Sequence, residues 1–341
     1  MKLAQMFCTV ADLQADLEAP GGNEARLYRA IREASQAIAR EIGWFIPVAE
    51  TFKTEGECGE KSLYMPPFLA LTGNITNYLQ TLTAADVILQ PTTPYWPNGP
   101  YDELEIRYNV GQVWSDVDED VVQVPILRGL YNETQATGAA LNGAIADDDE
   151  TITVDNGSKL SAGMVLKIGD EQMLVTGTGA PVETVTALAA AVTLGDESIQ
   201  VDNLALLNIG EVIRIGFESM QVYDKNSTHA AVRRGWNNTT KSTHADNDDV
   251  DVFRTFTVER GVNGTTAAAH ADATAIDRYV PPADVGYLCA QVATLMLSKA
   301  KGGYAGRTGS MDTGTVFYND AFPRYEWERI AANYHLPRMH K

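Results

Sequence analysis

The stretch that decides the fold is Glu150-Thr-Ile-Thr-Val-Asp-Asn156, because it occurs again as Glu197-Ser-Ile-Gln-Val-Asp-Asn203. The match continues without gaps at a constant offset of 47, through GMVLKIGDEQMLV (163–175) and GEVIRIGFESMQV (210–222). Of the 26 positions from 150 to 175, 13 are identical, so the chain contains an internal repeat. Alternating apolar residues, such as Ile152 and Val154, indicate that each copy is built of strands.

A second motif also occurs twice, at an offset of 26: VRRGWNNTT (232–240) and VERGVNGTT (258–266), each followed by His-Ala-Asp. Both copies of the first motif precede both copies of the second, so the inner pair forms one compact unit. The outer pair then forms a similar unit that the first one interrupts. We therefore expect a small β-module inserted into a loop of its own copy, with the inner module at 196–252 and the outer at 147–178 and 256–277.

The sequence on either side of this region predicts helices and a few strands. Leu27, Ile31 and Ile38 share one helical face that ends before Gly43, and a second apolar stripe follows Pro281-Pro282. A last short helix is expected from about 325 to 334, and short β-type runs at 62–65, 86–89, 104–108 and 121–124. The predicted class is α+β: a helical body with a small β-sheet element (1–146 and 278–341), carrying an inserted all-β appendage of two nested repeat modules (147–277).

The charge excludes one class of function. Asp and Glu outnumber Lys and Arg by 45 to 26, which gives a net charge of −19. A protein that grips nucleic acid needs a basic surface, whereas an acidic surface lets DNA pass without sticking. No apolar run approaches the roughly 18 residues that span a bilayer, and the N-terminal residues do not resemble a secretory signal. The expected location is a cytosol-like compartment or a particle assembled there.

Three short motifs resemble catalytic or ligand-binding sequences but lack their context. Asp312-Thr-Gly-Thr315 matches the aspartic protease tripeptide, yet it follows a polar approach and has no second copy. Gly59-Glu-Lys-Ser62 lacks the glycine spacing of a phosphate loop and predicts a turn before a strand. The acids of 246–251 lack the Gly and the terminal Glu of a calcium loop, and the repeat counterpart at 272–277 has lost most of them.

The histidines and cysteines do not form a recognisable reactive group. His244 and His270 occupy the same repeat position, which favours hydrogen bonds within each turn. Cys8, Cys58 and Cys289 lie far apart in the sequence and predict buried thiols rather than a disulfide framework or a zinc site. We therefore expect no catalytic residue, no cofactor and no metal ligand, and a protein that is not an enzyme.

Several segments together resemble one protein family. The helical segment 10–43, LYMPP (63–67), YWPNGP (95–100), VVQVPILRG (121–129) and PPADV (281–285) are similar to the head–tail connector adaptors of long-tailed bacteriophages. RGVNGTTA (260–267) resembles a small β-module of phage structural proteins. The size of the insertion departs from the usual adaptor and leaves the role of the β-modules open.

The resemblance implies a virion protein of the neck, made in the host cytoplasm. Its own copies would form a ring, usually twelve-fold, between the portal protein and a neck or tail-completion protein, with no membrane contact. Helices would surround a channel through which DNA passes without specific binding. The C-terminal stretch 322–341 would dock to the portal or to a neighbouring subunit, and its expected interface residues are Phe322, Tyr325, Trp327, Ile330, Tyr334 and Leu336.

Two other functions compete with this one. A carbohydrate-binding tail or fibre accessory protein would use the β-modules to contact host glycan, with the helical parts as a mount. A virion protease would depend on Asp312 alone.

Overall fold

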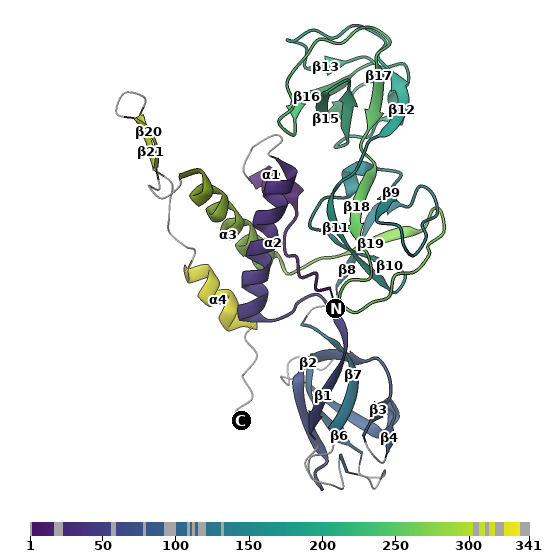
Figure 1. The fold of residues 1–341 in the computed structure, drawn as a ribbon, viewed down its shortest axis with the longest axis vertical. Helices are drawn as coiled ribbons and strands as arrows, with labels where there is room; N and C mark the ends of the chain where they lie inside the picture. Colours follow the sequence, from purple (N-terminus) through teal and green to yellow (C-terminus); the bar gives the residue numbers. More distant parts are fainter. Residues whose placement is uncertain are drawn as a thin grey trace.

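The described part of the chain forms three large antiparallel β-sheets in a row, with its helices gathered on one side (Figure 1). Strands make up 41% of this computed structural model and helices 21%. In the part of the chain that is described, no helix combines the length and the apolar character needed to cross a membrane. The structure describes residues 2–16, 23–55, 59–77, 80–91, 100–107, 110, 113–114, 121–130, 133–302, 307–310, 314–317 and 324–334.

The expected α+β class with a helical body is wrong, because residues 48–128 form a seven-stranded sheet with its own core around Phe68 and Trp114. The sequence predicted only short strands here, the first of them at 62–65, just before two prolines. Proline removes a hydrogen-bond donor from a strand. Strand β2 nevertheless runs through Pro66-Pro67, and its pairing with β6 shifts register between Tyr64 and Phe68. The order is β4-β3-β7-β2-β6-β5, with β1 paired to β7. These strands are β1 (Val48–Glu55), β2 (Ser62–Leu71), β3 (Ile75–Thr76), β4 (Thr81–Leu82), β5 (Val87–Pro91), β6 (Tyr101–Ile106) and β7 (Val121–Arg128).

The other two large sheets have the same strand order. We call them the outer module (134–179 and 255–279) and the inner module (181–253). The outer sheet runs β8-β19-β10-β11-β18-β9 and the inner sheet β12-β17-β14-β15-β16-β13, so each strand has a counterpart. Outer-module strands are β8 (Thr134–Ala140), β9 (Thr151–Thr153), β10 (Val165–Ile168), β11 (Glu171–Thr178), β18 (Thr255–Glu259) and β19 (Ala275–Tyr279). Inner-module strands are β12 (Val182–Ala187), β13 (Ser198–Ile199), β14 (Val212–Ile215), β15 (Glu218–Lys225), β16 (Ala230–Trp236) and β17 (Asp249–Val252).

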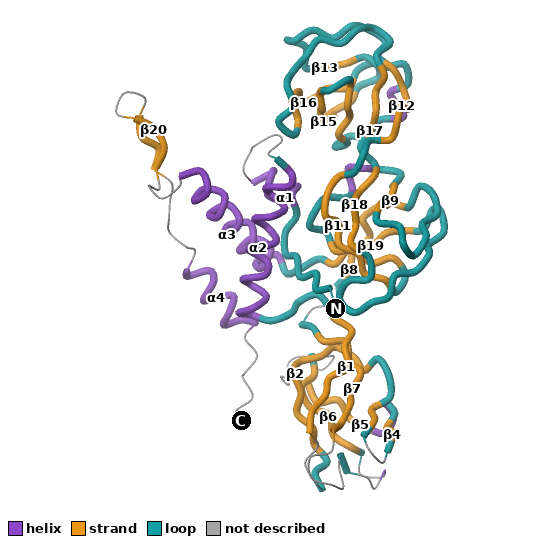
Figure 2. Tube along the Cα trace, viewed as in Figure 1, coloured by secondary structure: helices purple, strands orange, loops and turns teal. Residues whose placement is uncertain are grey.

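The inner module occupies the connection between β11 and β18 of the outer module (Figure 2). Its own counterpart of that connection is the short turn between β15 and β16. Strands β8 and β12 both begin before the module limits of 147 and 196 that the sequence suggested, because these first strands share few identical residues.

The helices are α1 (Val10–Asp16), α2 (Glu24–Ile42), α3 (Ala283–Gly302) and α4 (Arg324–Tyr334), and β20 (Arg307–Ser310) pairs with β21 (Gly314–Phe317) between the last two. Gly43 ends α2 at a φ of 113°, as predicted. At the other end, the Asn23 side chain caps the helix by accepting a hydrogen bond from the Arg26 N–H at 3.0 Å. The helices share one core with the segment 2–9 and with residues of the outer module, including Val165 and Val262. The outer module is thus the part on which the helices are mounted.

A buried ion pair holds the inner module on the outer one. Glu211 is fully buried and pairs with Arg254, at 2.7 Å from Nε and 3.0 Å from Nη2, in the link between β17 and β18. The same carboxylate accepts the N–H of Gly157 in the outer module at 3.0 Å. A Cβ on Gly157 would lie only 2.1 Å from the Phe253 carbonyl oxygen, so the two modules meet backbone to backbone.

We predict that Gly157→Ala destabilises the protein by about 1–3 kcal/mol, because the added carbon overpacks this junction. Gly195→Ala is the matched control, since a Cβ there meets no atom within 4 Å. Urea denaturation of the full chain measures both variants, and equal stability of the two would contradict the contact.

Candidate interaction surface

Helix α4 is anchored to the rest of the chain by its inward face. The Tyr334 hydroxyl donates a hydrogen bond to Asp284 Oδ1 at 3.0 Å, and its ring meets Phe45 edge to face at 5.1 Å between centroids. Ile330 is 1% exposed in the helical core, and Trp327 packs against the same core. Three residues predicted for an interface with a partner are therefore engaged within this chain.

The outward face of α4 is polar and aromatic. Tyr325 is 75% exposed, and beside it Arg324 and Glu328 form a solvent-exposed ion pair at 3.2 Å. Among the described residues of the predicted interface, Tyr325 is the one whose side chain is mostly exposed. Phe322 and Leu336 lie outside the described residues. Because Ile330 and Tyr334 fix the helix, Tyr325 is presented to solvent in a fixed place.

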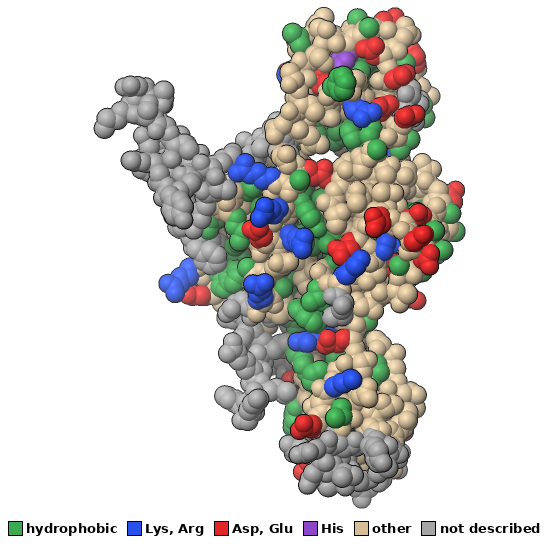
Figure 3. Space-filling model, in the orientation of Figure 1, with side chains coloured by type: hydrophobic (Ala, Val, Ile, Leu, Met, Phe, Trp, Pro, Cys, Tyr) green, Lys and Arg blue, Asp and Glu red, His purple; other side chains and the backbone are tan. Residues whose placement is uncertain are grey.

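Charge is distributed unevenly between the helices and the modules (Figure 3). Helix α2 exposes Arg26, Arg29, Arg32 and Arg40, although the whole chain carries −19. Arg29 pairs with the exposed Glu33 at 3.1 Å, so three of the four arginines lie outside that pair. Sequence reasoning from net charge missed this basic face. The sequence does contain a signal for this face. Arg26, Arg29 and Arg32 are three residues apart and Arg40 follows eight residues later, so all four lie on the side of the helix opposite Leu27 and Ile31.

The most highly connected polar group of the inner module is a buried carboxylate. Glu218 pairs in a bidentate manner with Arg234, Nε to Oε1 at 2.7 Å and Nη2 to Oε2 at 2.6 Å. The N–H groups of Gly235 and Ser242 donate to the same carboxylate at 3.1 and 2.9 Å. His244 Nε2 lies 3.0 Å from Oε2 and donates, because the ionised carboxylate can only accept.

The outer module repeats this group residue for residue. Glu171 receives Arg260 at 2.7 and 2.8 Å, His270 Nε2 at 2.9 Å, and the N–H groups of Gly261 and Ala268 at 3.1 and 3.0 Å. The histidines were predicted to hydrogen-bond within their own turns, but here they bond to glutamates of the first motif, 26 residues away for His244 and 99 for His270. The sequence analysis did not find the Glu–Arg pairing, although the first motif contains both glutamates and the second both arginines.

Hydrogen bonds keep these carboxylates ionised. Burial raises the pKa of Glu218, but the hydrogen bonds from Arg234, Ser242 and His244 outweigh it and lower the pKa to about 2. The same balance lowers the pKa of Glu171. With both oxygens surrounded by donors and no exposed surface, each carboxylate serves to close its module.

The remaining candidates have local roles or fall outside the described residues. Asp248 accepts the Ala245 N–H at 2.8 Å and Asp251 pairs with Arg214 at 2.7 Å, so two of the loop acids are engaged within the module. Among the described residues, no group of three or more His, Cys, Asp or Glu side chains is arranged to hold a metal ion. Gly59 forms a turn before β2, as expected. Asp312 and Cys58 lie outside the described residues.

Two of the cysteines meet in the helical core. The Sγ atoms of Cys8 and Cys289 lie 3.2 Å apart, and Ser35 Oγ lies 3.2 Å from Cys289 Sγ. Both are buried thiols, and the hydrogen bond from Cys8 lowers the pKa of Cys289 despite its burial. The contact joins the segment 2–9 to α3 and α2.

Comparisons of the chain with protein-family models, with curated proteins and with solved structures find no match.

We predict that Glu218→Gln lowers the free energy of unfolding by about 3 kcal/mol or more, because it leaves the buried Arg234 without a counter-charge. Glu197→Gln, which changes an exposed glutamate of the same module, should stay within about 0.5 kcal/mol of the parent. Chemical denaturation of the full chain gives both values. A loss no larger than that of the control would show that the pair does not stabilise the module.

Proposed function

We propose that this protein is a non-enzymatic structural subunit of a tailed bacteriophage particle, a head–tail connector adaptor. Its copies form a ring in the neck, between the portal protein and a neck or tail-completion protein, and DNA passes through without specific binding. The observation that carries the proposal is helix α4, which is fixed from within by Ile330 and Tyr334 and presents Tyr325 outward. A rigidly mounted aromatic residue is the kind of anchor that protein interfaces use.

The sequence resemblance supports the same proposal. The similar segments include α1, α2, part of β2, β7 and the start of α3. The turn RGVNGTTA (260–267) lies in the outer module, where the N–H of its Gly261 donates to Glu171. The β-modules then project from the ring as appendages.

The basic face of α2 refines the arrangement. If α2 lined the channel, Arg26, Arg32 and Arg40, which lie outside the Arg29–Glu33 pair, would face DNA phosphates and hold the genome in place. We therefore place α2 against the acidic surface of a neighbouring subunit, where the attraction orients the copies in the ring. The channel surface is then left to the acidic remainder of the chain.

We predict that the purified full chain assembles into closed rings of identical copies, visible by electron microscopy and countable by native mass spectrometry. Tyr325→Ala should reduce assembly because it removes an anchor, whereas Tyr64→Ala should not, although Tyr64 is similarly exposed at 59% in the N-terminal sheet. A strictly monomeric chain, or equal effects of the two substitutions, would contradict the proposal.

One observation favours the carbohydrate-binding alternative. Phe217 is 99% exposed at the turn between β14 and β15, where the outer module has Asp170. Exposed aromatic rings are suited to stack on sugar faces. Glycan-array binding by the full chain that is lost in Phe217→Asp would support this alternative, and binding that is unchanged by the substitution, or absent, would count against it.

A further inference from the structure

The two modules share a fold but differ in what covers one of their faces. In the outer module, the face with Ala162, Val165 and Val262 is buried in one core with the segment 2–9 and the helices. The repeat offsets of 47 and 26 place Ile209, Val212 and Trp236 at the matching positions of the inner module. The outer module therefore shows how this type of face is used.

Asn263 is the centre of contact on the outer face. Its side-chain Oδ1 accepts the Ala4 N–H at 2.8 Å, and its Nδ2 donates to the Ala4 carbonyl at 3.2 Å. Its own N–H donates to the Lys2 carbonyl at 2.7 Å. A fully buried side chain thus clamps both main-chain groups of one residue, as a neighbouring strand would. Such recognition selects an extended backbone rather than a particular side chain.

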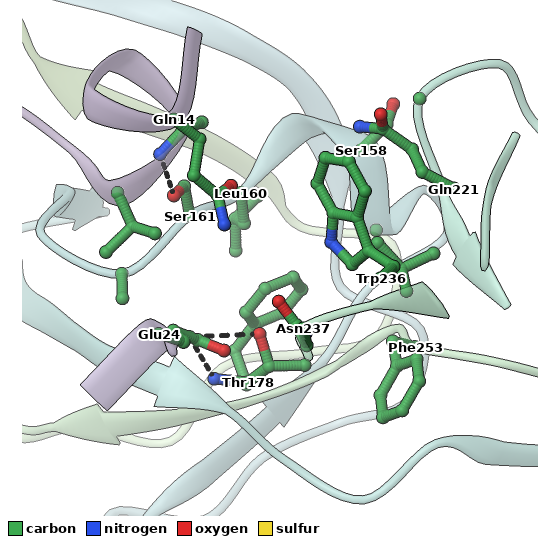
Figure 4. Close-up of a pocket in the computed structure, with 17 residues that line it drawn as sticks. Gln14, Glu24, Ser158, Leu160, Ser161, Thr178, Gln221, Trp236, Asn237 and Phe253 are labelled. Carbon is green, nitrogen blue, oxygen red and sulfur yellow. Dashed lines mark hydrogen bonds between the residues drawn. The ribbon is translucent and has the colours of Figure 1, made fainter. Parts of the chain in front are cut away.

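Asn237 is the matching residue of the inner module and has the same backbone conformation, but its side chain does not bind a backbone segment within the described residues. Its φ of 54° matches the 56° of Asn263. In the part of the chain that the structure describes, no hydrogen bond joins Asn237 to another residue, through either its side chain or its N–H. Asn237 and Trp236 line a cavity of about 220 Å³ between the two modules, α1 and the start of α2. Figure 4 shows both side chains at this cavity.

Part of the inner face is already covered. In the outer module the backbone of Cys8 and Thr9 packs on Gly163, where a Cβ would lie 2.9 Å from the Cys8 carbonyl oxygen. At the matching Gly210, the atom nearest to an added Cβ is Ser158 Cβ of the outer module, at 3.0 Å. The outer module thus closes the Gly210 end and leaves the Asn237 end open. Ile209, which is 53% exposed, remains uncovered as well.

We propose that the inner module binds a short, extended peptide segment of a partner protein in this cavity, with Asn237 clamping the N–H and C=O of one residue. Trp236 stands where the outer module has Val262, so it narrows the site and selects a small side chain, such as alanine, at the clamped position. The same segment of another copy is not available, because Ala4 and Phe7 are each 1% exposed in their own subunit. The inference follows from the internal repeat and does not depend on the proposed function.

The test uses the intact chain and a fluorescein-labelled peptide with the sequence of residues 2–7, Lys-Leu-Ala-Gln-Met-Phe, because this segment fills the matching outer site. Fluorescence anisotropy should show saturable binding of one peptide per chain with a Kd below about 1 mM. Asn237→Gly should weaken binding about tenfold or more, since two hydrogen bonds are lost and glycine keeps the left-handed backbone. Asn238→Gly is the matched control at a neighbouring asparagine with a φ of 61°, and it should leave binding unchanged.

Two further measurements decide whether the clamp acts on the main chain. A peptide with an N-methyl group on its alanine cannot donate to Asn237 and should bind as weakly as the parent peptide binds to Asn237→Gly. The proposal is overturned if no saturable binding occurs, if Asn237→Gly and Asn238→Gly bind alike, or if N-methylation has no effect. Binding that responds to Asn263→Gly but not to Asn237→Gly would show displacement of the chain's own segment and would overturn it too.

Discussion

The structure depends on two buried carboxylates, Glu171 and Glu218, each of which must meet an arginine. An ionised group in a module interior is costly unless it is paired and hydrogen-bonded, so neither module can close before its second motif returns to its first. In the inner module that partner is 16 residues away, but in the outer module Arg260 is 89 residues beyond Glu171. The whole inner module lies within that gap. Its two ends must therefore lie close together, and β11 and β18, which pair as neighbours, hold them so.

Nesting gives the two copies different surroundings, and this explains how their surfaces have diverged. The outer module supports the helices, and its Asn263 face is buried against the segment 2–9. The inner module is farther from the helices in the row of sheets (Figure 1). Its matching face therefore still has a cavity, and Asn237 there does not bind another described segment of the chain. Residues at matched positions differ between the modules in the same way. The outer module has Asp170 where the inner module has Phe217. One copy has become part of the framework, and the other is available for contacts with other molecules.

The sequence predicted the features whose causes lie close together in the chain. The ends of α2 follow from Asn23 and Gly43, the start of α3 follows Pro281-Pro282, and the range of α4 is nearly as expected. The seven-stranded sheet was missed because β1 (Val48–Glu55) has a mixed polar composition and is held along its full length by β7, more than 60 residues later. Likewise, Ile330 and Tyr334 were assigned to an interface with a partner, because the sequence does not show that Tyr334 contacts Phe45 and Asp284 or that Ile330 is buried in the helical core. Periodicity identifies an amphipathic helix but not the surface that it packs on.

The ionisation of Glu218 tests most directly whether a paired carboxylate closes each module. Nuclear magnetic resonance of the full chain with carbon-13 in its glutamate carboxyl groups follows each group through an acid titration, and Glu218→Gln assigns the resonance. The pKa should be about 2, well below the ordinary value of 4.5, so the group stays ionised at pH 3.5. Since the folded pKa is lowered, the stabilisation is complete above pH 4.5 and declines as the pH falls toward 2. A Glu218 carboxyl that titrates at an ordinary pKa in the folded chain would contradict the account.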